Sequence, residues 1–239
     1  MTWSIVARDP ETGSFGIAIA TKSFAVGALC PHGAGRIGAL ATQAFTNPLY
    51  GPDGLRLLAE GRSAGEVVAI LTAGDPGREV RQLHVIDRDG GTAAHTGREC
   101  VDWCGHLADR DVSVAGNMLA GPAVVEATLE TFRSRAGQAL PERLMAALDA
   151  GQAAGGDKRG RQSAAMKIWR TEPYPVLDLR VDDHAEPLAE LRRLYGVAHE
   201  RFLAFVEAMP TRARPGGITD RAWIDRRAQE IQERAPRSS

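Results

Sequence analysis

Apolar and polar positions in the first part of the chain predict a β-hairpin followed by a buried strand. Residues 2–8 and 14–20 are largely apolar runs, and residues 9–13 between them are turn-forming types that end in a glycine. This arrangement predicts two antiparallel strands joined by a tight turn. Residues 36–43 are again mostly apolar, without alternation, which predicts a third strand that is buried on both faces.

Two helices are predicted to follow the third strand. Residues 50–54 contain a proline and two glycines and are expected to form a turn. Leucines then begin a helical pattern that is expected to end at Gly61. Ser63, with Glu66 three residues later, forms a capping-box pattern before an apolar run. The sequence therefore predicts a second helix that starts at Ser63.

The rest of the chain contains groups of strands and groups of helices. Strands are predicted at residues 81–87, 92–96, 100–107, 112–117, 162–170 and 176–181, and helices at residues 121–135, 141–150 and 187–205. Because the two types come in groups and do not alternate, a doubly wound parallel sheet is disfavoured. An α+β fold with two antiparallel sheets stacked face to face, and helices outside, is the expected arrangement.

We expect one domain over residues 1–206 and a different segment after it. Residues 207–239 contain prolines and the pair Gly216 and Gly217 before a charged, helix-like run around Trp223. This C-terminal extension is expected to lie over the surface or on a neighbouring subunit, or to be disordered, as charged segments with few apolar residues often are.

Composition narrows the class of protein. The 239 residues carry 29 Lys and Arg against 30 Asp and Glu, and this net charge of -1 gives no basic surface for nucleic acid. Charges and glycines interrupt every apolar run, so we expect no membrane span. Arg8, Asp9 and Glu11 stand where a signal peptide would be apolar, and a cytoplasmic protein is therefore expected.

The cysteines and histidines give no metal-binding pattern. Cys100 and Cys104 lie close to His106, but no fourth ligand follows at a matching spacing. A small, odd number of cysteines is typical of a reducing compartment. We expect no metal and no cofactor, and the isolated His95, His106 and His184 are expected to be structural or exposed.

Thr2 is the first candidate for chemistry, although many cytosolic proteins have threonine at this position without using it. Methionine aminopeptidases remove Met1 when the second side chain is small, which would leave Thr2 with a free α-amine. Its hydroxyl and that amine then form a nucleophile and its general base. An α-amine has a pKa of about 7.7–8.0, which suits proton transfer near neutral pH.

Four segments of the chain carry a family resemblance. They read SIVARD at residues 4–9, ATQAFTNPLYG at 41–51, GNMLAG at 116–121 and AGGDKRGRQSA at 154–164. Together they resemble the bacterial family of unknown function numbered 1028, which is placed among the Ntn (N-terminal nucleophile) hydrolases. The resemblance covers most of the chain before residue 206. It implies a four-layer αββα sandwich, and it implies that Thr2 stands at the nucleophile position of such hydrolases.

Three further residues are candidate catalytic groups beside Thr2. Lys22 follows the second predicted strand, so hairpin pairing would bring it towards Thr2, where a cation lowers the pKa of the amine; it is equally compatible with an exposed lysine. The amide of Asn117 is a candidate oxyanion donor or a turn residue. Asp157 lies in a glycine-rich loop and would orient the Thr2 amine, or pair with Arg159 and fix the loop.

Five polar residues are candidate substrate-binding groups. Gln43 and Asn47 leave the third predicted strand and are placed to donate to a substrate carbonyl, or to cap the strand end. Arg159, Gln162 and Ser163 belong to a dense polar cluster just before a predicted buried strand, which would bind a charged substrate group.

These observations give a leading hypothesis and two alternatives. The leading one is an Ntn-type amidohydrolase that cleaves a small amide or peptide-like substrate and acts as a homo-oligomer, without nucleic-acid or membrane partners. The alternatives are an inactive Ntn fold that binds a small metabolite, and a scaffold whose homo-oligomer is the functional unit. Retention of Met1 would favour the first alternative, and loss of assembly on truncation at Pro210 would favour the second.

Overall fold

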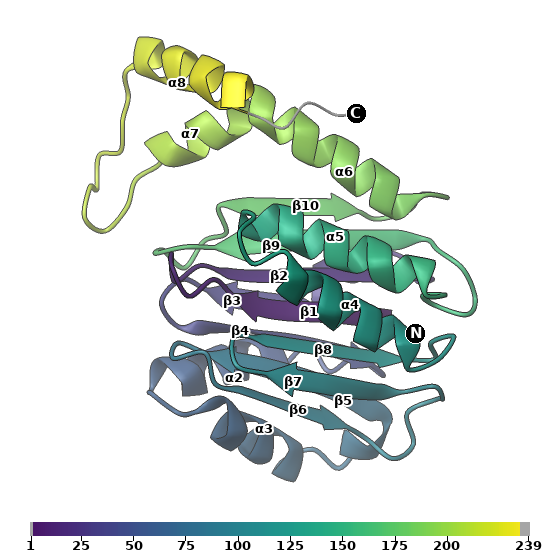
Figure 1. The fold of residues 1–239 in the computed structure, drawn as a ribbon. Helices are drawn as coiled ribbons and strands as arrows, with labels where there is room; N and C mark the ends of the chain where they lie inside the picture. The colour runs from purple at the N-terminus through teal and green to yellow at the C-terminus, as the bar shows by residue number, and fades with distance from the viewer. Residues whose placement is uncertain (1, 235–239) are drawn as a thin grey trace.

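The computed structural model describes residues 2–234 and contains two antiparallel β-sheets (Figure 1). The larger sheet has the strand order β10-β9-β2-β1-β8-β7, and the smaller has the order β3-β4-β5-β6. The strands of the larger sheet are β1 (Thr2–Arg8), β2 (Phe15–Thr21), β7 (Gly105–Asp109), β8 (Val112–Asn117), β9 (Ser163–Trp169) and β10 (Leu177–Val181). Those of the smaller sheet are β3 (Pro31–Ala34), β4 (Gly38–Ala44), β5 (Arg81–Asp87) and β6 (Thr92–Thr96).

The predicted hairpin at the start of the chain is confirmed. β1 and β2 pair antiparallel, with Trp3 opposite Ala20 and Arg8 opposite Phe15. Gly13 in the connecting turn has a φ of +67°, a conformation that glycine adopts without strain. The predicted third strand is also confirmed as β4, which is buried almost throughout because it lies between the larger sheet and two helices.

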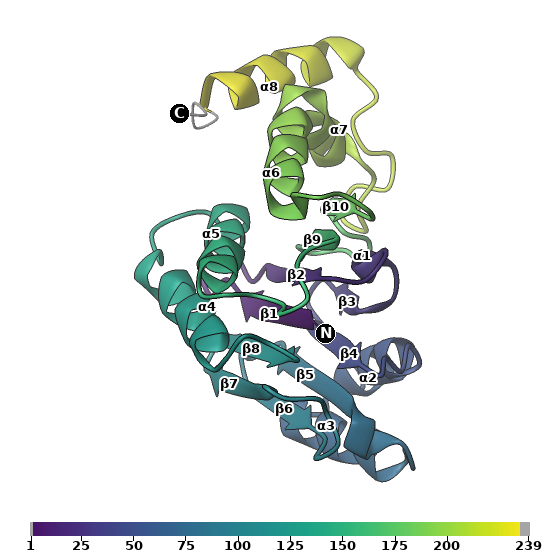
Figure 2. The same ribbon diagram turned by 90° about the vertical axis from the view of Figure 1, so that its right-hand side faces the viewer.

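The two sheets pack face to face across a thin apolar layer (Figure 2). Val6 and Ile17 from the larger sheet contact Ala39 and Ile86 from the smaller one, and all four are fully buried. Small side chains such as Ala39 let the sheets approach closely. The expected pair of stacked antiparallel sheets is therefore confirmed.

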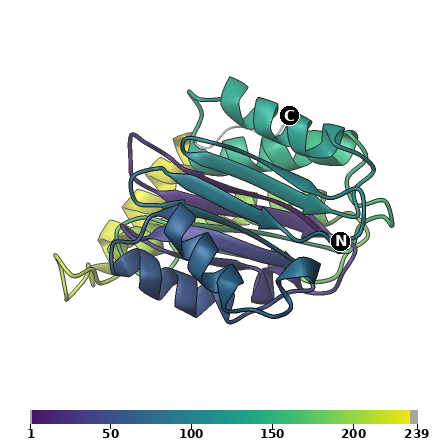
Figure 3. The same cartoon turned by 90° about the horizontal axis from the view of Figure 1, so that it is seen from below.

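Helices cover the outer faces of both sheets, and Figure 3 shows the sheets lying between them. α4 (Ala123–Ser134) and α5 (Leu140–Ala153) pack on the larger sheet, where Trp3 and Ile5 meet Leu144. α2 (Tyr50–Ala59) and α3 (Ala64–Ala73) pack on the smaller sheet. The N-terminus of α3 has the predicted capping box between Ser63 and Glu66.

The turn predicted at residues 50–54 is wrong, because α2 begins at Tyr50. Pro52 fits the first helical turn, where its missing N–H leaves no hydrogen bond unmade. The glycines serve close packing: a Cβ on Gly51 would lie 2.2 Å from the His32 ring, and one on Gly54 would lie 2.6 Å from Leu40. The turn-like composition of this segment is thus set by contact of the helix with the smaller sheet.

Two short elements were not predicted, and one strand is shorter than expected. α1 (Val26–Leu29) and β3 lie between the hairpin and β4. The strand expected at residues 100–107 begins only at Gly105, because residues 97–104 form a loop.

The helix predicted at residues 187–205 is continuous but not uniform. It consists of α6 (Pro187–Val197), a π-helical segment (Ala198–Phe202) and α7 (Leu203–Ala208). α8 (Arg221–Arg234) folds back on the last two, and Ala204, Ala208, Ile224 and Ala228 form a small core of their own. Much of the C-terminal extension is therefore an ordered helix beyond the β10 edge (Figure 1), while residues 235–239 lie outside the described residues. No helix within residues 2–234 combines the length and apolar composition needed to cross a membrane.

Candidate functional site

The start of β1 meets the ends of its two neighbours at one edge of the sandwich. Asn117, the last residue of β8, is the register partner of Thr2. On the other side Thr21, the last residue of β2, follows the partner of Trp3, and the Thr2 hydroxyl donates to the Thr21 hydroxyl at 3.2 Å. Thr2 is buried, with 6% of its surface exposed. Antiparallel pairing thus brings three polar side chains together that are far apart in the sequence.

Strand alternation decides which way Thr2 faces. Trp3 and Ile5 point towards α4 and α5 and join the core on that side. Ser4 and Val6 point towards the smaller sheet, where Ser4 bonds Gln43 and Val6 packs in the apolar layer. Because residues two apart share a face, Thr2 lies on the face that looks into the space between the sheets.

A chain of hydrogen-bonded amides supports Asn117 from within the sandwich. Asn117 Nδ2 donates to Gln82 Oε1 at 3.1 Å, and Gln43 Nε2 donates to the same oxygen at 2.7 Å. Gln82 Nε2 in turn donates to the Gly116 carbonyl at 2.9 Å. Gln43 and Gln82 are both fully buried, and these bonds add to the backbone pairing with β1 in holding the end of β8.

His84 extends this network deeper between the sheets. Its Nε2 lies 2.8 Å from Ser4 Oγ and its Nδ1 lies 3.1 Å from Ser113 Oγ. Ser4 gives its proton to Gln43 Oε1 at 2.6 Å, so we assign the His84 proton to Nε2, with Nδ1 accepting from Ser113. Complete burial lowers the pKa of His84 to about 3, and the ring is neutral at physiological pH.

The glycine-rich loop lies against the same end of the sandwich. Asp157 is 2% exposed and accepts hydrogen bonds from the backbone N–H of Lys22 at 2.7 Å and from that of Arg159 at 2.9 Å. It also pairs with the Arg159 guanidinium at 3.2 Å and forms a β-bridge with Leu119. The loop is therefore tied both to the end of β2 and to the segment after Asn117.

Of the nine candidate residues, the structure gathers Thr2, Asn117, Asp157 and Arg159 at this end, with Gln43 beneath them. Lys22 is next to Asp157 through its backbone, but its exposed Nζ donates to the Arg161 carbonyl at 3.1 Å. The side chains of the other three have partners of their own, although Ser163 is the register partner of Thr21. Gln162 donates its side-chain amide to Asp183, Ser163 donates to the Ser23 carbonyl and accepts from Val26 N, and Asn47 donates to Asp75.

Asn47 belongs to a separate cluster around Asp75. The carboxylate of Asp75 also accepts from the Tyr50 hydroxyl at 2.7 Å and from Arg81 Nε at 2.5 Å. Burial acts to raise the pKa of Asp75, but hydrogen bonds led by those of Tyr50 and Arg81 outweigh it and hold this pKa well below its usual range. The cluster fastens the loop after β4 to the start of β5.

Sequence reasoning missed five residues of the site and its support: Ser4, Thr21, Gln82, His84 and Ser113. A signal was present. Polar residues two apart in otherwise apolar strands, such as Thr2 with Ser4 and Gln82 with His84, mark one face of a buried strand as polar. Read together, these pairs would have predicted a polar layer between the sheets.

Cys100, Cys104 and His106 have partners other than a metal. The Cys100 thiol donates to the Arg81 carbonyl, the Cys104 thiol to the Cys100 carbonyl, and the His106 ring lies 2.9 Å from Thr96 Oγ1. Within residues 2–234, no group of three or more His, Cys, Asp or Glu side chains is placed to hold a metal ion.

Comparison with known proteins places the chain in a family. Residues 2–191 match the model of the family of unknown function DUF1028, and the chain belongs to that family. It is similar to the crystal structure of protein SPO2555 from Silicibacter pomeroyi, described with the same family model. The two share 34% identity with a TM-score of 0.85, covering 92% of this chain and 96% of that one.

A second solved structure is far less similar. Anbu (ancestral beta-subunit) from Yersinia bercovieri aligns at 12% identity with a TM-score of 0.37, covering 87% of this chain and 98% of that one. A similarity at this level carries no argument about the fold or the function. No curated protein matches the chain.

Proposed function

We propose that this protein is an Ntn-type amidohydrolase that uses Thr2 as its nucleophile after removal of Met1. The observation that supports this proposal is the position of Thr2. It begins the central strand β1, faces the space between the sheets, and lies beside Thr21 and Asn117. In this proposal the stacked sheets and their helices correspond to a four-layer αββα sandwich of the Ntn type over residues 1–206, with residues 207–239 as an extension.

The reaction would proceed in two steps on a small amide or peptide-like substrate. The Thr2 hydroxyl gives its proton to the α-amine while Oγ attacks the carbonyl carbon, forming an oxyanion. The C–N bond then breaks and the leaving amine takes that proton, which leaves an acyl ester on Thr2. Water, deprotonated by the same amine, attacks the ester, releases a carboxylate and restores the hydroxyl. No cofactor enters either step.

Asn117 and Asp157 have roles in this scheme that fit their surroundings. The Asn117 amide carries two N–H groups and uses one of them on Gln82, so the other is the proposed donor to the oxyanion. Asp157 fixes the loop through the backbone N–H of Lys22 and is proposed to orient the Thr2 amine. The Lys22 ammonium donates to the Arg161 carbonyl, so its proposed role is limited to a through-space charge that favours the free-base form of this amine.

The candidate substrate-binding residues divide by their contacts. Arg159, whose side chain is 41% exposed, is proposed to meet a polar or charged substrate group. Gln43 holds Gln82, and Ser163 holds the start of α1, so both are proposed to shape the site from behind. Asn47 and Gln162 are assigned to loop support through Asp75 and Asp183.

The test is the intact mass of untagged protein before and after treatment with a threonine-directed electrophile such as a β-lactone. We expect loss of Met1 and one adduct per chain, mapped to Thr2 by peptide sequencing. The adduct should disappear in Thr2→Ala and persist in Thr171→Ala, which changes an exposed threonine.

Two results would oppose the proposal. Retained Met1 with no adduct would exclude the mechanism and favour the metabolite-binding alternative, and an adduct that survives Thr2→Ala would place the reactive group elsewhere. Native mass spectrometry of the same sample tests the accompanying proposal of a homo-oligomer. This proposal is supported by Phe24 and Phe45, which are 70% and 75% exposed on the loops that follow β2 and β4.

A further inference from the structure

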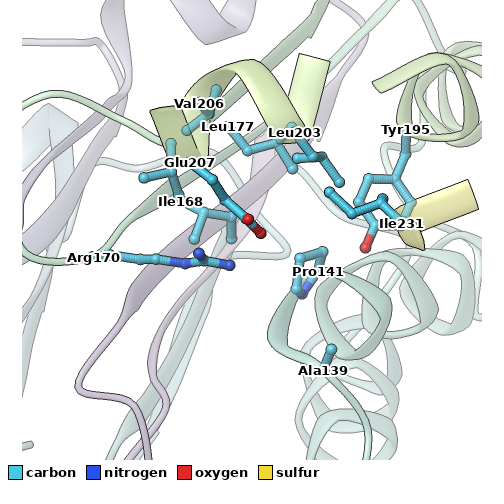
Figure 4. A pocket seen from close by; sticks show the side chains of 11 residues that line it. Ala139, Pro141, Ile168, Arg170, Leu177, Tyr195, Leu203, Val206, Glu207 and Ile231 are labelled. Carbon is cyan, nitrogen blue, oxygen red and sulfur yellow. The ribbon is translucent and has the colours of Figure 1, made fainter. Parts of the chain in front are cut away.

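A cavity of about 170 Å³ lies between the β10 edge of the larger sheet and the C-terminal helices (Figure 4). Its walls come from α5, β9, β10, α6, α7 and α8, and Thr2 is not among its lining residues. Because α8 supplies part of the wall through Ile231, the cavity takes its form from the folding of the C-terminal helices onto the body.

Most of the cavity wall is apolar. Pro141, Ile168, Leu177, Leu203 and Ile231 present their side chains to it from five different elements. An apolar cavity of about 150 Å³ is large enough to hold benzene. This cavity therefore suits a ligand whose body is one six-membered ring or a short alkyl chain.

Two charged side chains line the cavity, and only one of them forms an ion pair. Glu207 lines the cavity, and its carboxylate is paired with Arg227 through two hydrogen bonds, at 2.5 and 3.0 Å. Arg170 also lines the cavity, and within residues 2–234 its guanidinium forms no ion pair. Arg170 is exposed, so its guanidinium stands where the cavity opens to solvent. A cation at the opening of an apolar space is placed to meet the charged head of an anionic ligand.

Tyr195 lines the cavity without adding a charge. Its hydroxyl donates to Glu142 Oε1 at 2.8 Å, and burial, followed by the nearby Glu142 carboxylate, raises the pKa of Tyr195 far above its usual value. Glu142 itself lines a separate surface hollow on the other side of Ala139 and not this cavity. Arg170 thus remains the group that would meet the head of a ligand.

We propose that this cavity binds a small monocarboxylate, with its ring or alkyl body among the apolar side chains and its carboxylate on the Arg170 guanidinium. The planar guanidinium matches a carboxylate through two parallel hydrogen bonds, which gives both strength and orientation. This site is separate from Thr2 and does not depend on the hydrolase proposal.

The test uses the full chain with labelled Ile, Leu and Val methyl groups, and benzoate as the probe. The Thr2→Ala protein is used in parallel, because a carboxylate is also the product of amide hydrolysis and would otherwise report on Thr2. We expect benzoate to shift the methyl signals of Ile168, Leu177, Leu203 and Ile231 in both proteins. Benzyl alcohol, which lacks the charge, should bind at least about tenfold more weakly.

Variants separate the charge from the apolar space. Arg170→Gln should weaken benzoate binding by about tenfold or more and leave benzyl alcohol unchanged, while Arg226→Gln, at an exposed arginine of α8, should change neither. Ile231→Trp should exclude both probes by filling the cavity. If the Arg170→Gln variant does not fold, Arg170→Lys replaces it. This variant keeps the positive charge but loses the two parallel hydrogen bonds of the guanidinium, so it should also weaken benzoate binding.

Three outcomes would overturn the proposal. The first is the absence of methyl shifts at millimolar benzoate. The second is an affinity for benzoate equal to that for benzyl alcohol, both in wild type and in Arg170→Gln. The third is methyl shifts that are confined to the surroundings of Thr2 and vanish in Thr2→Ala. The second would mark the cavity as an uncharged apolar void, and the third would assign the carboxylate to the hydrolase site.

Discussion

At the scale of single residues, the polar side chains between the sheets distinguish this sandwich from a purely apolar one. Ser4, Gln43, Gln82 and His84 are each fully buried, and each has hydrogen-bond partners in the opposite sheet. A buried polar group costs free energy unless it is hydrogen-bonded, so these residues fix how the two sheets are positioned against each other at the Thr2 end. They prepare a polar environment for Thr2 and Asn117 without being exposed themselves.

His84 should make stability depend on pH. Burial lowers its pKa to about 3 in the folded protein, against an ordinary value of 6.5. Between these values the unfolded chain binds a proton that the folded chain does not, so the free energy of unfolding falls as the pH drops below about 6.5. The slope contributed by one such group approaches about 1.4 kcal/mol per pH unit. Above pH 6.5 the group contributes no pH dependence.

Urea unfolding at a series of pH values measures this slope. His84→Gln should flatten it between about pH 4.5 and 6.5, whereas His184→Gln, at an exposed histidine, should leave it unchanged. His32 and His106 also have lowered pKa values because of burial, and they act in the same direction in every variant. Equal slopes in wild type and His84→Gln would show that His84 is not buried as a neutral ring.

At the scale of elements, a helix start that is fixed by local hydrogen bonds can be predicted from the sequence, whereas a start that depends on packing is missed. The Ser63 and Glu66 pair places the start of α3 from the sequence alone, because both hydrogen bonds of the capping box are local. The start of α2 at Tyr50 was missed because Gly51 and Gly54 read as turn residues, although their role is contact with His32 and Leu40.

Removing the cap of α3 should cost a measurable part of the stability. Ser63 Oγ accepts from Glu66 N at 3.3 Å, and Glu66 Oε2 accepts from Ser63 N at 2.9 Å. Ser63→Ala should lower the free energy of unfolding by about 1 kcal/mol. Ser134→Ala, at the C-terminal end of α4, should change it little. A loss as large in the Ser134 variant would indicate that the measured effect is not that of an N-cap.

At the scale of the whole molecule, the C-terminal helices form a second, smaller unit on the sheet edge. α7 and α8 share a core of few side chains, while the body is held by two sheets and the helices packed on them, α6 included. The match to the family model ends at residue 191, before this unit. The small core should therefore open independently of the body.

A buried charge in the small core should release α8 selectively. Ala228 is 7% exposed, and Ala228→Asp would place an unpaired carboxylate there, at a cost of several kcal/mol. Amide hydrogen exchange should rise across α8 and stay unchanged in β1 and β2. Gln229→Asp, an exposed neighbour on the same helix, is the control. Faster exchange in β1 as well would show that the C-terminal unit is part of the main cooperative core.

The sequence alone determined most elements of this protein and its first candidate for chemistry. The hairpin of β1 and β2, the buried β4 and the cap at Ser63 follow from periods and turn types that act over a few residues. Thr2 was identified from its position after Met1 and the small size of its side chain. The grouping of strands and helices gave the expectation of stacked antiparallel sheets, and the resemblance to a family then implied a four-layer sandwich.

Only the tertiary structure decided which polar residues meet. A strand pattern states which face is apolar, but it does not state which strand of another sheet will lie opposite. For this reason the sequence did not show that Asn47 would bond to Asp75. Gln82 and His84 mark a polar strand face in the sequence, but only the structure shows that they support Asn117 and Ser4. The cavity at Arg170 likewise exists only through the meeting of α5, β9, β10 and the C-terminal helices, since no local pattern encodes a contact between segments so distant in the chain.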